Sequence, residues 1–363
     1  MRRNNSYALE SLVRPEVLKL QPYESHTVPG CIKLDANENP FLWPTGMRRA
    51  LVAEDLPFTR YPDGTAVELK EALADYTGIE KEGILVGNGS DELIQLIFST
   101  FGGPERSVLL HPPTFSMYQA AAQVTGTGVI QVPLLEGLRL DTDQMNEAAC
   151  SPDVSVIIVC NPNNPTGSLF PREDILNLVR ETGKIVVVDE AYAEFANETL
   201  IDEIENYSNL LVLRTFSKAF GLAGLRLGYV LGQKETIALI NRVRQPFNVN
   251  TFSQKAGVLA LTHWAEYQNQ IEILRSETNK VYEALVKIPN IRVFPTRANF
   301  VLFQAADAET WSKELLSKGI AVRYMGDLRG LSSCLRVSTG LPAENDLFIA
   351  AIRDIAAMSN ERG

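Results

Sequence analysis

Histidine and cysteine are scarce in this chain of 363 residues. It has three histidines, and its four cysteines, Cys31, Cys150, Cys160 and Cys334, show no CxxC spacing. A zinc site needs about four such ligands close together, so the small number and scattered spacing of these residues argue against a metal centre. The cysteines are expected to be reduced, buried thiols of a cytoplasmic protein.

Long apolar runs and an excess of basic charge are also missing. No run approaches the ~20 apolar residues that a helix needs to cross a bilayer, and residues 1–19 lack the apolar core of a signal peptide. The 34 basic and 44 acidic residues leave a net charge of -10. That charge disfavours binding to nucleic acid or to an anionic membrane, so we expect small-molecule substrates.

The composition that remains is that of an ordinary globular protein, with 45% hydrophobic and 21% charged residues. The length favours about two domains. Residues 1–45 are rich in proline and read as an N-terminal arm. We expect a large domain over 46–254 and a small C-terminal α/β domain over 255–363.

Three apolar runs of strand length each precede a conspicuous polar residue: 154–160 before Asn161, 185–188 before Asp189, and 210–213 before Lys218. Helical stretches separate the runs, as in a parallel sheet that is covered on both faces. Ligands bind at the carboxyl ends of such strands, so these polar residues are expected to converge. A buried Asp189 would need a cationic partner, such as a protonated pyridine nitrogen, although a helix cap or a surface carboxylate stays open.

Lys218 lies in a loop of small and polar residues. Thr215 and Ser217 precede it, and two glycines and Arg226 follow. Such a lysine could form a Schiff base with a phosphorylated aldehyde while the loop donors and Arg226 neutralise the phosphate. A second glycine loop, NGSDE at 88–92, leads into a helix whose free amides suit a phosphate.

The segments NPNNPTG, DEAY and SKAFGLAGLRLGY, at these intervals, resemble the fold-type-I, class II aminotransferases that use pyridoxal 5'-phosphate. The resemblance covers the chain from about residue 20 to 336. Together with NGSDE and DANENP, these segments are most similar to those of the histidinol-phosphate aminotransferase branch. It implies an α/β fold with a mostly parallel central sheet flanked by helices, a small C-terminal α/β domain and an N-terminal arm.

The resemblance also implies catalytic roles for Lys218, Asp189 and Tyr192. Lys218 would bind the cofactor and move a proton between the substrate Cα and the cofactor C4′. Asp189 would keep the pyridine nitrogen protonated. Tyr192 and Asn161 would bind the ring oxygen O3′, and Phe115, where the family often has tyrosine, would stack on the ring.

Phosphate and substrate contacts complete the implied site. The phosphate would be held by Ser90, Asp91, Thr215, Ser217, Arg226 and Tyr61 of the partner subunit. Substrate would be bound by Tyr23, Asn161, Arg323 and Arg336. Each of the two arginines lies in an apolar strand, which favours an anion clamp over the alternative of a structural ion pair.

The implied activity is transamination in histidine biosynthesis by a cytoplasmic homodimer with shared active sites. Histidinol phosphate and 2-oxoglutarate would exchange an amino group to give imidazole acetol phosphate and glutamate. Three alternatives stay open: an aromatic amino-acid aminotransferase, a phosphothreonine decarboxylase, and a non-catalytic regulator that binds the cofactor. The regulator would require an added DNA-binding segment, for which residues 1–20 leave no room.

Overall fold

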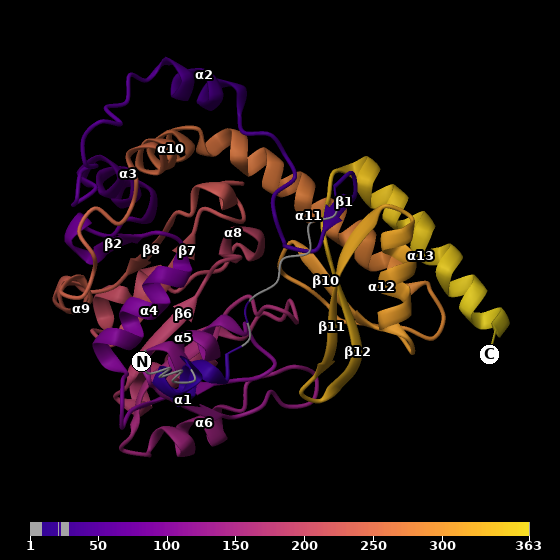
Figure 1. The fold of residues 1–363 in the computed structure, drawn as a ribbon, viewed down its shortest axis with the longest axis horizontal. Helices are drawn as coiled ribbons and strands as arrows, with labels where there is room; N and C mark the ends of the chain where they lie inside the picture. The colour runs from indigo at the N-terminus through magenta and orange to yellow at the C-terminus, as the bar shows by residue number, and fades with distance from the viewer. Residues whose placement is uncertain (1–8, 21, 23–28, 363) are drawn as a thin grey trace, which may run out of the picture.

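The computed structural model describes residues 9–20, 22 and 29–362 (Figure 1). Tyr23 lies outside the described residues, so its substrate contact stays a prediction. Two separate sheets organise the chain. The larger has seven strands in the order β2-β8-β7-β6-β5-β3-β4, and the smaller has five in the order β1-β11-β12-β10-β9.

The seven-stranded sheet is parallel except at β8, which runs antiparallel to both of its neighbours. Its strands are β2 (Ile84–Gly87), β8 (Gly228–Leu231), β7 (Leu210–Thr215), β6 (Ile185–Asp189), β5 (Val154–Cys160), β3 (Ser107–Leu110) and β4 (Gly128–Gln131). Alternate residues of one strand enter different cores: in β5, Val156 and Ile158 join one apolar cluster, and Ile157 and Val159 join the other. Burial on both faces explains why these strands read as unbroken apolar runs.

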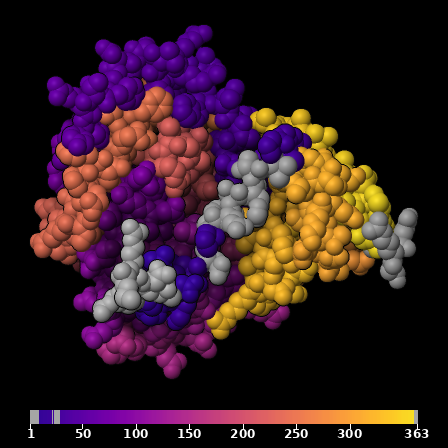
Figure 2. Space-filling view, in the orientation of Figure 1, coloured from indigo at the N-terminus to yellow at the C-terminus, as the bar shows by residue number. Residues whose placement is uncertain are grey.

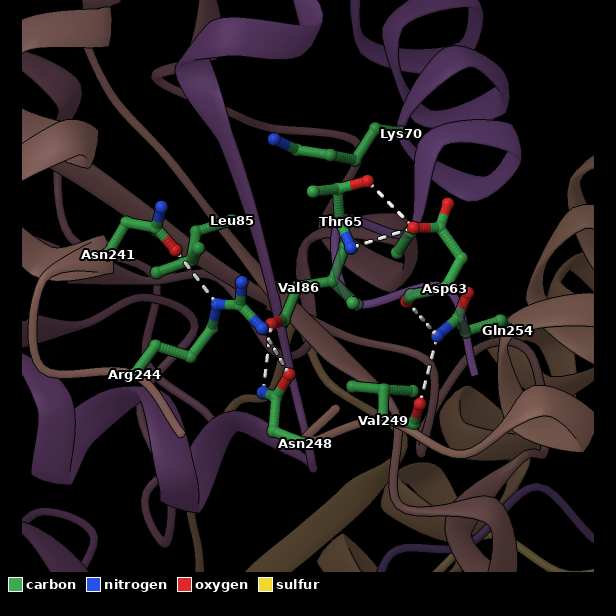
Figure 3. Close-up of a pocket in the computed structure, with 12 residues that line it drawn as sticks. Asp63, Thr65, Lys70, Leu85, Val86, Asn241, Arg244, Asn248, Val249 and Gln254 are labelled. Carbon is green, nitrogen blue, oxygen red and sulfur yellow. Dashed lines mark hydrogen bonds between the residues drawn. The ribbon is translucent and has the colours of Figure 1, made fainter. Parts of the chain in front are cut away.

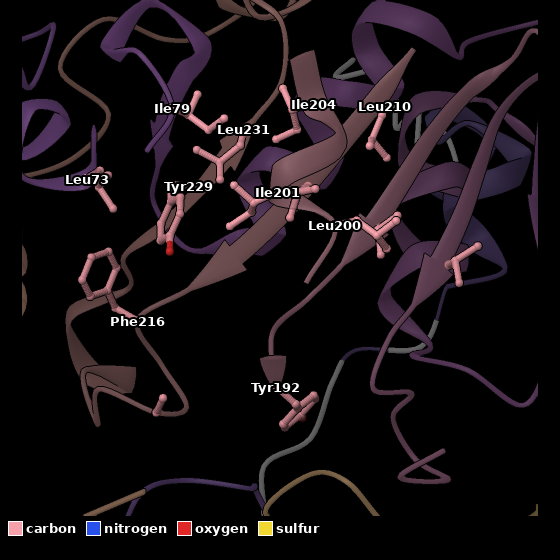
Figure 4. Close-up of a cluster of buried hydrophobic side chains, with 14 of the residues drawn as sticks. Leu73, Ile79, Tyr192, Leu200, Ile201, Ile204, Leu210, Phe216, Tyr229 and Leu231 are labelled. Carbon is pink, nitrogen blue, oxygen red and sulfur yellow. The ribbon is translucent and has the colours of Figure 1, made fainter. Parts of the chain in front are cut away.

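Helices cover both faces of this sheet. The helices on one face are α4 (Ser90–Phe101), α5 (Met117–Thr125) and α9 (Lys234–Asn241). Those whose apolar residues pack on the other face are α2 (Thr45–Ala53), α3 (Val67–Thr77), α6 (Thr142–Ala149), α7 (Arg172–Thr182), α8 (Ala193–Ala196), α10 (Thr251–Thr262) and the first half of α11 (Trp264–Val286). Figure 4 shows part of this second core, where Tyr229, Leu231 and Leu210 project from the strands.

The smaller sheet contains β1 (Ile32–Leu34), β11 (Ile320–Leu328), β12 (Leu331–Ser338), β10 (Phe300–Gln304) and β9 (Arg292–Val293). It packs on α12 (Ala308–Ser317), α13 (Pro342–Arg362) and the second half of α11. β1 comes from the predicted arm and pairs in parallel with β11, with Ile32 opposite Ile320. Figure 2 shows this indigo part of the chain against the orange and yellow C-terminal lobe.

The predicted fold class is confirmed: a mostly parallel sheet flanked by helices stands beside a smaller α/β unit. The domain division at 45 and 254 stays a prediction. By apolar packing, the change from one core to the other falls within α11, because Leu274 belongs to the large core and Val281 to the small one.

Two absences concern only the described residues. No helix in this part of the chain is long and apolar enough to span a membrane. No cluster of three or more His, Cys, Asp or Glu side chains that could hold a metal ion occurs there. All four cysteines are free thiols, but Cys150 is exposed rather than buried as expected, because it follows the last turn of α6 at the surface.

A buried ion-pair network ties β7 to the segment that follows β6. The guanidinium of Arg214 lies 2.7 Å from Glu190 Oε2 and 2.7 Å from Glu194 Oε1, and Nη2 donates to the Thr199 hydroxyl at 2.9 Å. Glu190 also accepts hydrogen bonds from the Thr199 hydroxyl and from the Leu200 backbone amide. The network fixes residues 190–200 against β7.

We expect Arg214→Met to lower the free energy of unfolding by about 3–5 kcal/mol, because it leaves buried carboxylates without their cation. Arg180→Met is the control, since the Arg180–Glu173 pair lies at the surface and its loss should lower stability far less. Urea unfolding measures both variants. Equal losses of stability would show that the buried network has no special role.

Candidate active site

The carboxyl ends of β5, β6 and β7 meet at one edge of the large sheet. Cys160 is in register with Asp189, and Asp189 is in register with Leu213. The backbone amide of Asn161 donates to the carbonyl oxygen of Asp189 at 2.8 Å. The loop that begins at Asn161 therefore starts directly beside Asp189.

Lys218 meets the N-terminal segment at this edge. Its Nζ donates to the carbonyl oxygen of Ala36 at 2.9 Å and lies 5.8 Å from the centre of the Tyr192 ring. Burial, together with repulsion from the Arg336 cation, lowers the pKa of Lys218 to about 8. More of this amine is neutral near pH 7 than for an exposed lysine, as a nucleophile requires.

Asp189 is a carboxylate with 3% exposure. Its Oδ2 accepts a 2.6 Å hydrogen bond from the hydroxyl of Tyr118, and its Oδ1 accepts one of 3.1 Å from the Ala191 amide. Burial raises the pKa of Asp189 to about 6, against the opposing effect of these two donors. Within the described parts of the chain it has no ion-pair partner, so a bound cation is the partner that its chemistry calls for.

Tyr192 is held by a residue that sequence reasoning missed. The Asn37 side-chain amide donates to the Tyr192 hydroxyl at 2.9 Å. Asn37 has a φ of 54°, and its backbone amide donates to Ser338 Oγ at 2.7 Å. The sequence motif DANENP supports the family resemblance, but it does not predict the contact of Asn37 with Tyr192. That contact depends on how the N-terminal arm packs against the large sheet. Burial raises the pKa of the Tyr192 hydroxyl, so it stays protonated.

Two asparagines of the NPNNPTG loop have different surroundings. The Asn161 side chain is engaged with Phe170: its Oδ1 accepts from the Phe170 amide at 2.8 Å, and its Nδ2 faces the Phe170 carbonyl oxygen at 3.4 Å. Asn164 instead accepts a 2.6 Å hydrogen bond from Arg336 Nη1. The ligand contacts predicted for Asn161 therefore fit Asn164 better, and we correct that assignment.

A cradle for an anion forms where α4 begins. Arg226, with a φ of 49°, directs Nη2 to Asp91 Oδ2 at 2.7 Å. A Cβ on Gly89, whose φ is 81°, would lie 2.7 Å from that same Nη2, so only glycine leaves this space open. Ser90 opens the helix, and its first-turn amides have no partner inside the helix.

The loop between β7 and Lys218 uses one of its hydroxyls for its own shape. The Thr215 hydroxyl accepts from the Ser217 amide at 3.1 Å and lies 3.4 Å from the Leu227 carbonyl oxygen. Thr215 and Ser217 are both buried beside Lys218. Thr215 thus supports the turn that presents the lysine.

Arg323 and Arg336 are directly opposite each other on β11 and β12. Arg336 is 8% exposed, donates through Nη2 to the Asp35 carbonyl oxygen at 2.7 Å, and lies 5.4 Å from the centre of the Phe300 ring. Opposite residues of an antiparallel strand pair project from the same face of the sheet, so both arginines can serve one anionic ligand.

The two predicted aromatic contacts differ in their surroundings. Phe115 is half-buried at the entry to α5, with its ring centre 5.5 Å from that of Tyr118. Tyr61 is 81% exposed and stacks on Phe247 at 4.6 Å. Among the described residues, no other predicted site residue contacts Tyr61.

A polar pocket next to Tyr61 is separate from the site at the strand ends (Figure 3). Its Asp63 carboxylate is used by the Thr65 and Val67 amides, and Arg244 donates to Asn241 Oδ1 and Asn248 Oδ1, both at 2.8 Å. None of the predicted site residues lines this pocket.

Comparisons with known proteins agree with this geometry. The family described as aminotransferase class I and II matches residues 29–352. The chain belongs to this family. It is 55% identical over 352 residues to a histidinol-phosphate aminotransferase of Desulfitobacterium hafniense (strain Y51), a match that covers 96% of this chain and 98% of that protein.

Two solved structures are also similar. A histidinol-phosphate aminotransferase from Sinorhizobium meliloti, in complex with pyridoxal-5'-phosphate, has a TM-score of 0.88 and 25% identity, covering 96% of this chain and 98% of that one. An L-threonine-O-3-phosphate decarboxylase from Porphyromonas gingivalis has a TM-score of 0.77 and 27% identity, covering 89% and 99%. A similar fold therefore occurs in a protein that is named for a different reaction.

The two loop asparagines should respond differently to replacement by alanine. Asn161→Ala should destabilise the protein by about 1–3 kcal/mol, because it leaves the buried Phe170 amide without its acceptor. Asn164→Ala should weaken binding of a substrate carboxylate, because Arg336 loses its 2.6 Å partner, and it should also lower stability, because both side chains are buried. Thermal unfolding and substrate affinity measure the two effects. The reverse pattern would restore the original assignment to Asn161.

Proposed function

We propose that this aminotransferase exchanges an amino group between histidinol phosphate and 2-oxoglutarate, giving imidazole acetol phosphate and glutamate. The relative with 55% identity over almost the whole chain supports this substrate. The structural observation that carries the proposal is the pairing of Arg323 with Arg336. One guanidinium suits an α-carboxylate, and a second beside it suits a phosphate ester.

The residues present fit pyridoxal 5'-phosphate as the cofactor. Asp189 is a buried carboxylate without a cation in the described part of the chain, and Gly89, which has no Cβ, lets the Arg226 guanidinium lie against the loop that opens α4. In this proposal Asp189 pairs with the ring nitrogen, Tyr192 and Asn164 face the ring oxygen, and Phe115 covers the ring. The phosphate is held by the first-turn amides of α4 at Ser90 and Asp91 together with Ser217 and Arg226, while Thr215 shapes the loop. When bound, the cofactor supplies an aldehyde carbon and an electron-withdrawing pyridinium ring.

Lys218 then serves as nucleophile and as proton carrier. Its depressed pKa makes the neutral amine more populated than in an exposed lysine, and Nζ of that amine can accept the proton released from the substrate Cα. Arg336, held by Asn164 and by the Asp35 carbonyl oxygen, would orient the anionic group of the substrate, a phosphate in histidinol phosphate and an α-carboxylate in glutamate, so that this proton faces Lys218. Tyr192 stays protonated and can donate its hydroxyl hydrogen.

We further propose a cytoplasmic homodimer in which Tyr61 of the partner subunit completes the phosphate site. Large apolar side chains near Tyr61 are exposed in the single chain: Phe58, close before it in the sequence, by 70%, and Phe247, on which it stacks, by 43%. An exposed cluster of this kind is typical of a subunit interface. The four free thiols fit a reducing compartment.

The substrate assignment is tested by comparing histidinol phosphate with phenylalanine, tyrosine and phosphothreonine as substrates of the purified protein. We expect the highest kcat/KM for histidinol phosphate and a strict need for 2-oxoglutarate in turnover. Faster reaction with phenylalanine would favour an aromatic aminotransferase. Release of carbon dioxide from phosphothreonine would favour the decarboxylase seen among the structural neighbours.

Arg323→Lys should raise the KM for histidinol phosphate about tenfold to a hundredfold, because lysine cannot form the bidentate bond to phosphate and a charged hydrogen bond contributes ~1.5–3 kcal/mol. The KM for glutamate should change less. Arg336→Lys should weaken both substrates, since in this proposal Arg336 binds the phosphate of histidinol phosphate and the α-carboxylate of glutamate. Unchanged histidinol phosphate kinetics in Arg323→Lys would remove this residue from the clamp.

A further inference from the structure

The hydroxyl of Tyr118 has no role in the function proposed above. Tyr118 lies in the first turn of α5, is fully buried, and donates to Asp189 Oδ2 at 2.6 Å. We propose that Tyr118 is a positioning residue that keeps Asp189 ionised and fixes the plane in which its carboxylate meets a cationic ring nitrogen. The proposal rests on the proposed use of Asp189 as the partner of the cofactor.

Orientation follows from the two hydrogen bonds to the carboxylate. Tyr118 holds Oδ2 and the Ala191 amide holds Oδ1, so one donor reaches each oxygen from a different element. A carboxylate has about four acceptor positions, of which two remain for a ligand. Without Tyr118, only the single 3.1 Å bond from Ala191 would restrain the Asp189 side chain.

Ionisation follows from the balance between burial and hydrogen bonding. Burial alone favours the neutral acid, which would be a weak partner for a pyridinium nitrogen. A hydroxyl that donates to a carboxylate over 2.6 Å stabilises the charged form instead. Burial outweighs the hydrogen bonds, but it raises the pKa of Asp189 only to about 6, so most of the carboxyl is still ionised at neutral pH.

No cation in the described region takes over this task. The titratable groups that act on Asp189 or adjoin it are Tyr118 from α5, Asp91 from α4, Cys160 from β5, and Glu190 and Tyr192 from the segment after β6. Asp91 and Glu190 oppose its ionisation. β7 contributes the apolar Leu213 in register. Tyr118 is therefore the main side-chain donor that counters burial.

The test uses the cofactor-free protein, so that it does not depend on the substrate. A carboxyl whose pKa is raised on folding contributes stability that is fully present below its unfolded pKa and lost as the pH rises through its folded pKa. In the wild type this loss should end near pH 6. In Tyr118→Phe the pKa of Asp189 should rise by about one to two units, because a hydrogen bond to a charged group is lost.

Tyr118→Phe should therefore cost little stability at pH 5. At pH 8 its effect on the unfolding equilibrium constant should be roughly tenfold to a hundredfold larger than at pH 5. Urea unfolding at both pH values measures it. Tyr267→Phe is the matched control, since its hydroxyl is buried but bonds to Met47 Sδ at 3.1 Å. Its penalty should be the same at both pH values. An equally pH-independent penalty in Tyr118→Phe would overturn the proposal.

A second comparison holds even if Tyr118→Phe does not fold. The stability of the wild type relative to Asp189→Asn should fall with rising pH and level off near pH 6. A fall that continues to about pH 8 would mean that Tyr118 does not support the ionised form.

In the cofactor-loaded protein, Tyr118→Phe should also shift the pH titration of the cofactor's visible absorption band, whereas Tyr267→Phe should not. If these results hold but histidinol phosphate is a poor substrate, the substrate assignment fails and the role of Tyr118 stands.

Discussion

The buried guanidinium of Arg214 is the interaction on which the geometry of the site depends. It belongs to β7, one residue before Thr215, and binds Glu190 and Glu194, which follow Asp189 directly in the chain. The segment that carries Asp189 and Tyr192 and the segment that leads to Lys218 are thus joined by ion pairs between buried side chains. A buried cation needs fully matched partners, so this contact permits few alternative arrangements of the loops.

The N-terminal segment is the second constraint. Its strand β1 extends the small sheet beside β11, while the residues that follow cross to the large sheet. Ala36 accepts from Lys218, Asn37 binds Tyr192 and Asp35 binds Arg336. Three consecutive residues therefore touch the amine, the phenol and the guanidinium on which the proposed chemistry depends. A segment that belongs to the small sheet thus contacts residues at the edge of the large one.

Charge in the site is controlled mainly by burial. Desolvation lowers the pKa of Lys218 and raises that of Asp189, so each is moved toward its neutral form. Specific contacts then act on each charged form. The Tyr118 hydroxyl stabilises the ionised carboxylate of Asp189, and the Arg336 cation further destabilises the ammonium form of Lys218. An anionic, pyridine-containing cofactor would bring a cation to Asp189 and an electrophile to Lys218.

The sequence alone determined the fold class, because apolar runs of strand length between helical stretches specify a parallel sheet that is buried on both faces. It also determined that Asp189 and Lys218 share one edge, since residues after parallel strands must emerge on the same side. Contacts between distant segments were decided only by the tertiary structure. The pairing of Tyr118 with Asp189 spans 71 positions and that of Arg336 with Asn164 spans 172. The choice of Asn164 over Asn161 likewise depends on the path of one loop past Phe170 and β12. Periodicity and motif spacing describe which face or edge a residue occupies, but which atom it meets depends on how separate elements pack.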